Sequence, residues 1–594
     1  MQSISRLSIQ TFRPQILHIA HRCPMLIATS SESQIMRSLD TFTRFLAGQD
    51  VDEDAILALP RRRPHAQRPA AQDLACAAFP EETLIKALIK YEEFRVKAAA
   101  SVRAAREARL EAARLSNNAG GKLIMLQGPW KGQELDPLDL NGPKATPMPV
   151  KIPGEDAFSG VFKFLSANGD PSRLLSSDAD DLPNGARIGK DLTSGTPFVE
   201  FDRGIVYVDG RLDLCKMVLG PTHIGALIEA LEKNQHVTQF LLGNNIIATT
   251  GAKRIAAFIR SHPERIETWY IAGCHITTRP FKELADAMAG SSRITNVWLK
   301  RNPLGTDSVP SLVHLISSAP HLRTLDLENT ELGDAGVAEL FTSLKGKPSA
   351  LRNIYLNALG LGVRGCRALA EYLDDPASHM ESLFLASNPI GDAGMAELAP
   401  VLGRHKSLVR ISLASTGLTQ VGISQLCNAL ADHPNLLAVD LGASLTSIAH
   451  SQRYNYVDGK AVPAIARLIN APAMRWLGFS RTALSPSELA ELKAIVAQSN
   501  LVVFEAYSIG KERFCDLATR QTLLANRRKF FPEVENPEEF LTSEACRFLR
   551  NTPDVRLVDS QYRTQDKKLK VPPVQVWEDG DETWKLVLED AKQV

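Results

Sequence analysis

A repeat of 28 or 29 residues runs through the middle of this 594-residue chain, and it constrains the fold more than any other feature. In its first clear copy, apolar residues stand at Val237, Phe240, Leu242 and Ile247. Asn245 stands two residues before Ile247. Further copies in the same register begin at Ile266, Ile294, Leu322, Leu351, Met380 and Leu408. Weaker copies begin at Leu212, Leu436, Met474 and Leu501. This succession in one register predicts a stacked repeat array rather than one globular core.

Each copy has the pattern of one strand followed by one helix. In Leu325-Asp-Leu327 alternate side chains point to opposite faces of a strand, so the leucines face inward and the residue between them faces outward. An amide at the Asn position satisfies backbone groups of the turn that follows. A glycine then precedes a helical run, as in Gly336-Val-Ala-Glu-Leu-Phe. A single copy cannot bury its apolar faces, so the copies must stack. The predicted fold is therefore an α/β solenoid with a parallel concave sheet and convex helices.

Two phrases of the repeat resemble a known family. Leu325-Asp-Leu-Glu-Asn-Thr-Glu-Leu-Gly-Asp-Ala-Gly336 and Asn388-Pro-Ile-Gly-Asp-Ala-Gly394 are similar to the unit of the ribonuclease-inhibitor-like leucine-rich repeat proteins, over residues 209–508. The resemblance implies a leucine-rich repeat horseshoe. The family includes inhibitors, receptor sensor domains, ubiquitin-ligase receptors and activators of a small GTPase, so the resemblance implies action on other proteins. The turn Asn or Cys is replaced at Thr330, Leu359, Thr416 and Thr482.

Composition divides the rest of the chain around this array. The expected parts are a leader (1–30), a helical region (31–120), a loop-rich linker with an N-terminal cap (121–200), the repeat domain (201–508) and a C-terminal helical cap with a tail (509–594). In the last part we expect a helix over Pro537–Leu549, whose end, Ala545–Leu549, seals the last repeat.

The leader has the composition of a targeting segment. It holds Arg6, Arg13 and Arg22 with several serines, and the first acidic residue of the chain is Glu32. This is typical of a mitochondrial transit peptide, although Pro14 would interrupt an amphipathic helix. A disordered leader, or an extension ahead of an internal start at Met25 or Met36, also explains this composition, and we prefer that interpretation. We therefore expect a cytoplasmic protein, with a mitochondrial one as the alternative.

Composition and motifs argue against several classes of function. A formal net charge of +1 argues against a nucleic-acid binder. The eight cysteines lie far apart, without CxxC pairs or zinc spacing, which predicts buried, reduced thiols and no metal site. We find no apolar run long enough for a membrane span. The sequence also lacks a serine elbow, a P-loop, a dinucleotide fingerprint and an HExxH motif, so neither an enzyme nor a cofactor is predicted.

The outward residue of each strand forms a column along the predicted concave wall, and this column is rich in aromatic residues. Neighbouring strands lie about 4.8 Å apart, so Tyr270 should touch Trp298 and Tyr355 should touch Phe384. The charged residues expected beside them are Lys300, Arg301, Asp326 and Glu328. Aromatic residues ringed by charge are typical of protein-binding hot spots. We predict that these residues bind a protein partner; the alternative is that the rings serve strand packing alone.

The connection after the eighth strand, residues 443–462, is enlarged and contains Tyr454 and Tyr456. Enlarged loops on a regular scaffold often carry recognition, so both tyrosines join the predicted protein-binding site, although a tolerated surface insertion is an equal alternative. Two other functions compete with a simple recognition scaffold. One is a regulator that supplies Arg301 to a GTPase. The other is an adaptor of a ubiquitin ligase or a secreted effector.

Overall fold

The computed structural model describes residues 153–175, 182–183, 186–191, 194–442, 455, 457–482, 484, 486–508 and 517–564. The expected leader and the expected helical region (31–120) lie outside these residues. So do Tyr454, Tyr456 and the tail beyond residue 564, and the predictions made for them remain predictions.

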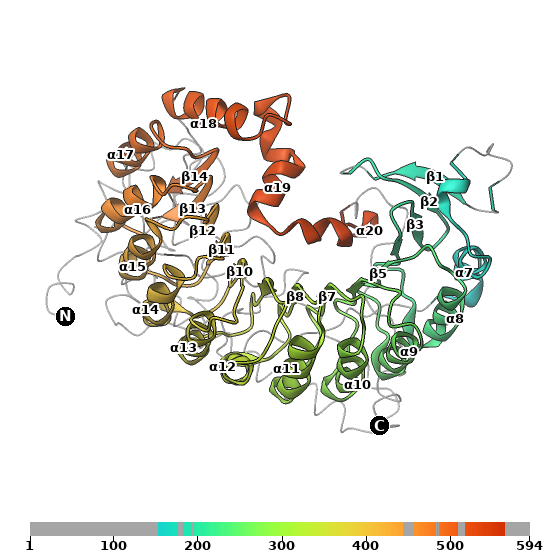
Figure 1. Cartoon of the computed structure of the whole chain (residues 1–594). Coiled ribbons are helices and arrows are strands. Elements are labelled where there is room, and N and C mark those ends of the chain that lie inside the picture. The colour runs from blue at the N-terminus through green and yellow to red at the C-terminus, as the bar shows by residue number, and fades with distance from the viewer. Residues whose placement is uncertain are drawn as a thin grey trace, which may run out of the picture.

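The described strands form one sheet in chain order, from β1 to β14 (Figure 1). Strands β1 to β4 pair antiparallel, and each pair from β4–β5 onward is parallel. The strands are β1 Arg187–Lys190, β2 Pro197–Glu200, β3 Ile205–Tyr207, β4 Arg211–Asp213, β5 Gln239–Leu241, β6 Thr268–Tyr270, β7 Asn296–Trp298, β8 Thr324–Asp326, β9 Asn353–Tyr355, β10 Ser382–Phe384, β11 Arg410–Ser412, β12 Ala438–Asp440, β13 Trp476–Thr482 and β14 Val503–Ser508.

From β4 onward, strands alternate with helices that form the convex wall of a horseshoe (Figure 1). The α-helices are α7 Ser159–Ser166, α8 Gly220–Glu232, α9 Ala248–Ser261, α10 Thr278–Ala289, α11 Val309–Ser318, α12 Gly333–Leu344, α13 Val363–Leu373, α14 Gly391–Leu402, α15 Gln420–Leu430, α16 Val462–Ile469 and α17 Pro486–Val496. Short 3₁₀ turns are η2 Glu155–Phe158, η3 Pro171–Arg173, η5 Thr306–Ser308 and η6 Gly459–Ala461. The predicted leucine-rich repeat solenoid is confirmed.

The core lies between the sheet and the helices. Leu242, Leu299, Leu327 and Leu385 are fully buried and belong to one continuous apolar cluster. Each repeat therefore buries its leucines against the repeats on either side, as the spacing of the apolar residues predicts.

Asparagine side chains connect neighbouring repeats at the turn after the strand. The amide nitrogen of Asn302 donates to one carbonyl oxygen of its own repeat and to one of the preceding repeat, each at 2.8 Å. Where Thr330 replaces asparagine, its hydroxyl donates to the carbonyl oxygen of Leu327 at 2.7 Å. Asn455 makes the two amide bonds, each at 2.9 Å, for the repeat that contains the enlarged connection. Asn455 therefore takes the turn-asparagine position of the repeat that contains β12.

Helix α18 (Leu517–Phe530) closes the C-terminal end of the array. The side-chain amide of Asn526 donates to the carbonyl oxygens of Ser499 and Leu501, each at 2.8 Å. These carbonyl groups lie just before β14, the last described strand. Helix α18 therefore supplies the hydrogen bonds that a further repeat would otherwise make.

The chain after α18 crosses the concave face, a placement that sequence analysis did not predict (Figure 1). We call residues 537–564 the strap; its elements are η7 Pro537–Thr542, α19 Glu544–Arg550, η8 Pro553–Val558 and α20 Gln561–Thr564. The expectation that Ala545–Leu549 seals the last repeat needs correction. Leu549 packs with Trp476 and Val503 on the concave side of the sheet, because α18 already covers the open end.

Candidate functional site

Two columns of side chains face the concave side. A typical strand here has three residues, and its middle residue points into the core, so the first and third residues both point outward. From β4 to β11 the first residues form what we call the polar column: Arg211, Gln239, Thr268, Asn296, Thr324, Asn353, Ser382 and Arg410. The third residues form the aromatic column: Asp213, Leu241, Tyr270, Trp298, Asp326, Tyr355, Phe384 and Ser412. Sequence analysis identified the aromatic column and overlooked the polar one.

The rings of the aromatic column form one continuous row. The ring centroids of Tyr270 and Trp298 lie 6.3 Å apart, and those of Tyr355 and Phe384 lie 4.2 Å apart in a stacked pair. Trp298 and Tyr355 also meet, at 5.1 Å, although β8 runs between their strands. The structure thus joins the two expected pairs into one row. All four side chains are buried.

Asp326 is a buried carboxyl within this row, with 1% of its surface exposed. Burial raises the pKa of Asp326 to about 7, an effect that nearby Glu328 increases and that the positive charges of Lys300 and Arg301 partly offset. One carboxylate oxygen accepts the backbone N–H of Glu328 at 2.9 Å. The raised pKa favours the protonated form of this side chain, which can donate a hydrogen bond as well as accept one.

Lys300, Arg301 and Glu328 are half-buried in the turns after their strands. The φ angle of Arg301 is 60°, in the left-handed region. The same conformation recurs at the equivalent turn positions Asn244 and Asn329, with φ of 60° and 54°. The backbone of Arg301 is therefore set by the repeat and does not in itself indicate a catalytic role.

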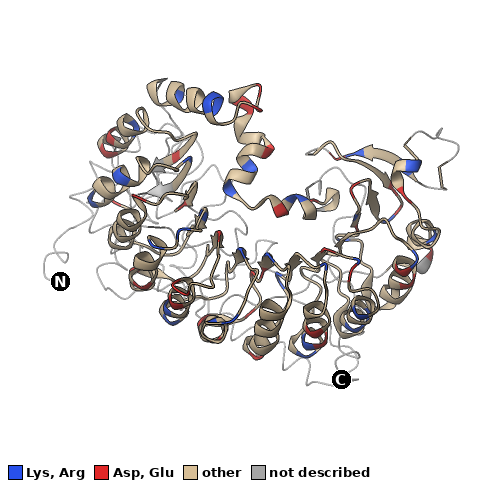
Figure 2. Ribbon diagram, viewed as in Figure 1, with Lys and Arg blue, Asp and Glu red and all other residues tan. Residues whose placement is uncertain are grey.

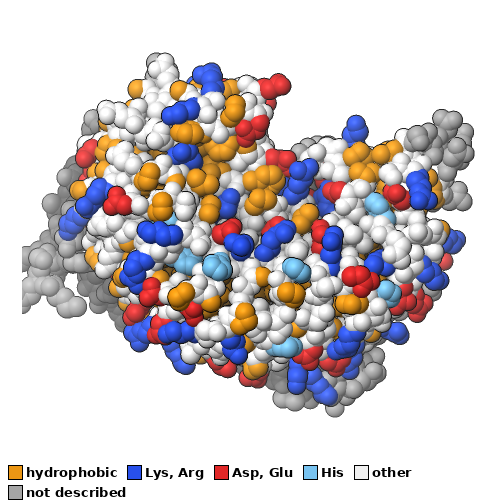
Figure 3. All heavy atoms as spheres, in the orientation of Figure 1, with side chains coloured by type: hydrophobic (Ala, Val, Ile, Leu, Met, Phe, Trp, Pro, Cys, Tyr) orange, Lys and Arg blue, Asp and Glu red, His pale blue; other side chains and the backbone are white. Residues whose placement is uncertain are grey.

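A cavity of about 710 Å³ lies between the strap and the aromatic row. Trp298, Tyr355 and Phe384 line the array side, and Arg547 and Arg550 line the strap side. In Figure 3 hydrophobic side chains gather on the side of the open notch where Figure 1 places α18 and α19. A space of this size is comparable to that of ligand-binding pockets.

Two buried indole groups face this cavity without an acceptor. Trp298 and Trp476 both line it, and their Nε1–H groups have no hydrogen-bond partner among the described residues. A buried donor left unpaired costs about 1–3 kcal/mol. Each of these nitrogen atoms has almost no surface accessible to solvent, so this cost falls on the packing of the cavity wall.

The middle of the strap is held by one carboxylate, that of Asp554, whose side chain is 8% exposed. Arg323 donates to it through Nε at 3.0 Å and through Nη2 at 2.6 Å. The hydroxyl of Thr324 also donates to it. With its NH₂ group turned toward the strap, the side-chain amide of Asn296 adds a bond of 2.9 Å. A buried carboxylate is stable when donors surround it in this way.

Arg410 and Tyr355 hold α19. The guanidinium of Arg410 donates to the carbonyl oxygens of Phe548 and Leu549, at 2.8 Å and 3.0 Å. The hydroxyl of Tyr355 donates to the side-chain oxygen of Asn551. Burial keeps the pKa of Tyr355 well above its usual value, so this hydroxyl remains a donor. Both contacts lie beside the aromatic row, and they fix the position of α19 relative to strands β9 and β11.

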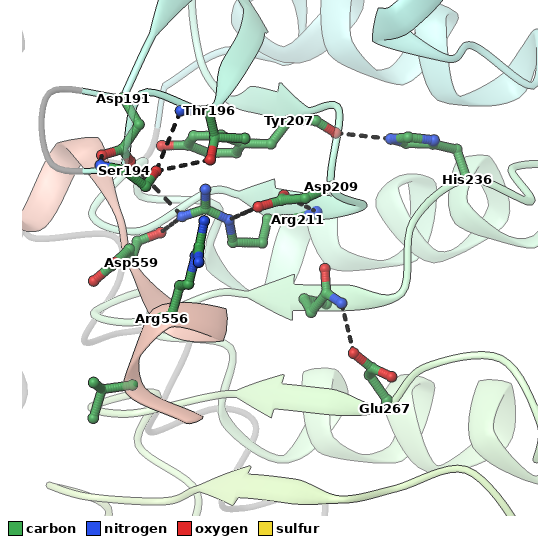
Figure 4. A network of polar contacts seen from close by, with 12 residues as sticks. Asp191, Ser194, Thr196, Tyr207, Asp209, Arg211, His236, Glu267, Arg556 and Asp559 are labelled. Carbon is green, nitrogen blue, oxygen red and sulfur yellow. Dashed lines mark hydrogen bonds and ion pairs between the residues drawn. The ribbon is translucent and has the colours of Figure 1, made fainter. Parts of the chain in front are cut away.

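The end of the strap meets a buried arginine, Arg211, at the N-terminal end of the polar column (Figure 4). The Nε of Arg211 pairs with Asp209 at 2.9 Å, and its Nη1 lies 3.7 Å from Asp191. Its guanidinium also stacks on the ring of Tyr207, with 3.9 Å to the centroid. From this position Arg211 donates to the carbonyl oxygen of Asp559 in the strap at 2.9 Å.

Three more polar contacts complete this end. The hydroxyl of Ser560 donates to Asp213 at 2.9 Å. The hydroxyl of Tyr562 accepts the backbone N–H of Gly204 at 3.2 Å. Within the strap, Nη1 of Arg547 donates to the carboxylate of Asp559 at 2.7 Å, which ties α19 to the end of η8. The strap is therefore anchored at both limbs and at the middle of the horseshoe.

Charges on the convex helices pair between neighbouring repeats, and acidic and basic residues intermingle there (Figure 2). Lys345 lies 3.3 Å from Glu371, and Arg367 lies 2.8 Å from Glu397. Exposed pairs of this kind contribute about 0–1 kcal/mol each. These two pairs thus connect neighbouring repeats.

Within the described ranges, His, Cys, Asp and Glu side chains form no group of three or more able to hold a metal ion. None of the described helices has both the length and the apolar character needed to cross a membrane. The side chains of Cys215, Cys274, Cys366, Cys427 and Cys546 are buried. Burial raises the pKa of the Cys274 thiol to about 12, which makes it a packing residue rather than a nucleophile.

Comparison with known proteins agrees with the fold. A family model described as "Leucine Rich repeat" matches residues 318–341 and 377–399. The chain is 28% identical over 217 residues to "NACHT, LRR and PYD domains-containing protein 5" of Mus musculus, covering 32% of this chain and 18% of that protein. It is 26% identical over 206 residues to "Ribonuclease inhibitor" of Sus scrofa, covering 34% of this chain and 44% of that protein. The chain thus spans less than half the length of these relatives.

Proposed function

The chain carries a leucine-rich repeat domain of the ribonuclease-inhibitor type, and we propose that it is a recognition module that holds another protein on the concave face of this domain. The observation that carries the proposal is the strap itself. Side chains of the concave strands bind a stretch of polypeptide through Arg323, Arg410 and Tyr355. A surface that holds one polypeptide in this way has the chemistry to hold another.

The aromatic row supports the same proposal. Tyrosine and tryptophan dominate the energetics of protein interfaces, and here Trp298 and Tyr355 border a cavity rather than a fully packed interior. The porcine relative is by name an inhibitor of a ribonuclease, and we extend this mode of action, on another protein, to the present chain.

The test is affinity capture with the tagged full-length chain, followed by mass spectrometry. Lys300 borders the cavity, so Lys300→Glu should reverse one of its charges and reduce capture of the partner at least about tenfold. Trp298→Ala should also reduce capture while the array stays folded, as far-UV circular dichroism would show.

Lys345→Glu is the matched control, because Lys345 lies beyond α12 on the outer side of the array and is 53% exposed. It should leave capture unchanged. Proteins that bind the Lys300→Glu and Trp298→Ala variants as well as the wild type would show that the concave face is not the binding surface. The identity of the captured proteins separates a plain scaffold from the finer alternatives, since ligase subunits would indicate an adaptor and a small GTPase would indicate a GTPase regulator.

A further inference from the structure

We propose that Asn296, Arg323 and Thr324 form a carboxylate-binding pocket, which the strap occupies through Asp554 and which a protein partner enters with an acidic residue of its own. The inference rests on the proposed function, since it assumes a polypeptide partner. It makes the strap an internal competitor, so that the partner binds as the strap is displaced.

The pocket has the composition of an acid receptor. Arg323 presents two N–H groups of its planar fork to the two carboxylate oxygens, which is the geometry that favours a carboxylate over other acceptors. Thr324 and Asn296 are themselves fully buried, and they belong to adjacent strands of the array. Because the backbones of these two strands are paired within the array, Asn296 and Thr324 keep their relative positions when the strap leaves, and the next occupant meets a partly preformed site.

The strap also shows how the acid is presented. Asp554 follows Pro553 in the first turn of η8, and the side-chain oxygen of Thr552 caps this turn by accepting the backbone N–H of Asp554. The pocket thus binds an acidic side chain that stands at the beginning of a helical turn. Acidic residues are common in the first turn of helices, where the backbone N–H groups favour negative charge. We infer that the partner presents an Asp or Glu in the first turn of a helix.

The way the strap is attached allows exchange. It contributes no strand to the described sheet, and the bonds at the Asp554 pocket join side chains, which a partner can replace one for one. A tethered ligand competes at an effective concentration in the millimolar range for short linkers. A partner at micromolar concentration therefore needs contacts beyond the acid, and the cavity beside Trp298 and Tyr355 provides them.

The first experiment measures this exchange with a defined probe. A fluorescein-labelled peptide of residues 550–562 is titrated against the full-length chain by fluorescence anisotropy. Asp554→Ala in the chain weakens the internal competitor, so the peptide should bind this variant at least about tenfold more tightly than the wild type. A peptide with Asn in place of its Asp554 should lose most of this gain, because a neutral amide offers Arg323 one acceptor oxygen and no negative charge.

The double variant Asp554→Ala/Arg323→Ala should also lose the gain. Arg367→Ala, which removes an exposed arginine of the convex face, is the matched control and should not affect peptide binding to the Asp554→Ala chain. Equal peptide binding by the wild-type and Asp554→Ala chains would overturn the inference. So would tight binding of the Asn peptide or tight binding by the double variant.

A second experiment needs no variant. Hydrogen exchange of the wild-type chain should show amides of α19 and η8 exchanging by local opening, at least about tenfold faster than amides of α12 in the array. Strap amides that exchange only on global unfolding would make the strap a permanent part of the fold and would overturn the inference.

The two proposals fail in different ways. Capture that depends on Lys300 but is the same for the wild-type and Asp554→Ala chains would leave the proposed function standing and overturn the role of the strap. Absence of concave-face capture together with acid-dependent peptide binding would show a carboxylate pocket that serves the strap alone, so that the proposed function falls and so does the claim that a partner enters the pocket.

Discussion

The polar and aromatic columns run along the same strands, two residues apart, yet they serve different purposes. The polar column hydrogen-bonds along the sheet and to the strap, as when Asn353 donates to Thr324 at 3.1 Å and Thr324 donates to Asp554. The aromatic column stacks ring on ring and borders a cavity. Hydrogen bonds fix position, whereas broad apolar surface supplies binding free energy. The comparison indicates that the polar column sets the register of a bound polypeptide and that the aromatic column supplies the affinity.

The largest effect is expected at the N-terminal end of the polar column. Arg211 is buried, and Arg211→Ala leaves the buried carboxylate of Asp191 without this partner and removes the bond to Asp559. Breaking a buried ion pair in this way costs about 3–5 kcal/mol. Thermal and urea unfolding should show a loss of stability of this size.

Arg323→Ala is the comparison for Arg211→Ala, because both arginines bind the strap but the Arg323 side chain is 43% exposed. It should cost the array much less stability, because the carboxylate that loses its partner, Asp554, belongs to the strap, and local opening of the strap exposes it to solvent. A loss as large as that of Arg211→Ala would mean that the strap contributes to the global stability of the array.

The second prediction uses one strand, β10, as its own control. Phe384 belongs to the aromatic column and Ser382 to the polar column. Phe384→Ala should cost about 3 kcal/mol, the lower end of the range for buried rings, because its ring stacks on Tyr355 but also borders the cavity. Ser382→Ala should cost about 0.5 kcal/mol, because its hydroxyl accepts one long bond, 3.4 Å, from Arg410. Urea midpoints of the two variants measure the difference, and equal losses would contradict the division between the columns.

The array could be predicted from the sequence because its pattern is periodic and local. Leucines such as Leu325 and Leu327 recur at fixed spacing, and each strand needs only its neighbours to become buried. The aromatic column followed from the alternation of side chains along a strand. The continuous row could not be predicted in this way. Trp298 and Tyr355 meet across an intervening strand, and that contact depends on the curvature of the sheet.

The strap and the polar column could not be predicted because they depend on each other. Arg323 and Asp554 are 231 residues apart, and no local pattern links them. Small polar residues such as Thr324 and Asn353 resemble ordinary exposed strand positions, although both are buried. One signal was present. The residue before the buried middle position is a small polar one from β6 to β10, where an exposed position would often carry Lys or Glu.

The third prediction concerns the buried acid of the aromatic column. Burial raises the pKa of Asp326 in the folded chain to about 7, above the value of about 4 expected in the unfolded chain. Between these values the folded state binds more protons, so its free energy of unfolding falls as pH rises from about 4 to about 7. Asp326→Asn does not titrate. Its stability relative to the wild type should therefore increase across this window and become constant above it.

Unfolding temperatures of both chains, measured from about pH 4 to pH 8, check this dependence. Glu328→Gln sharpens the result, because Glu328 contributes to the raised pKa of Asp326, so its neutralisation should move the window to lower pH. Parallel curves for the wild type and Asp326→Asn would show that Asp326 titrates alike in the folded and unfolded states.

The smallest effect is expected at Tyr355, which belongs to the aromatic row and also holds the strap. Tyr355→Phe keeps the ring that stacks on Phe384 and removes the hydroxyl that donates to Asn551. The loss of one such bond costs about 1 kcal/mol. If the columns act as proposed, this cost falls on the strap: hydrogen exchange should accelerate about fivefold in α19 and stay unchanged in α13, whose helix packs on the other side of the same repeat. An equal change in both helices would mean that the strap and the array open together, and the division between a fixed array and an exchangeable strap would fail.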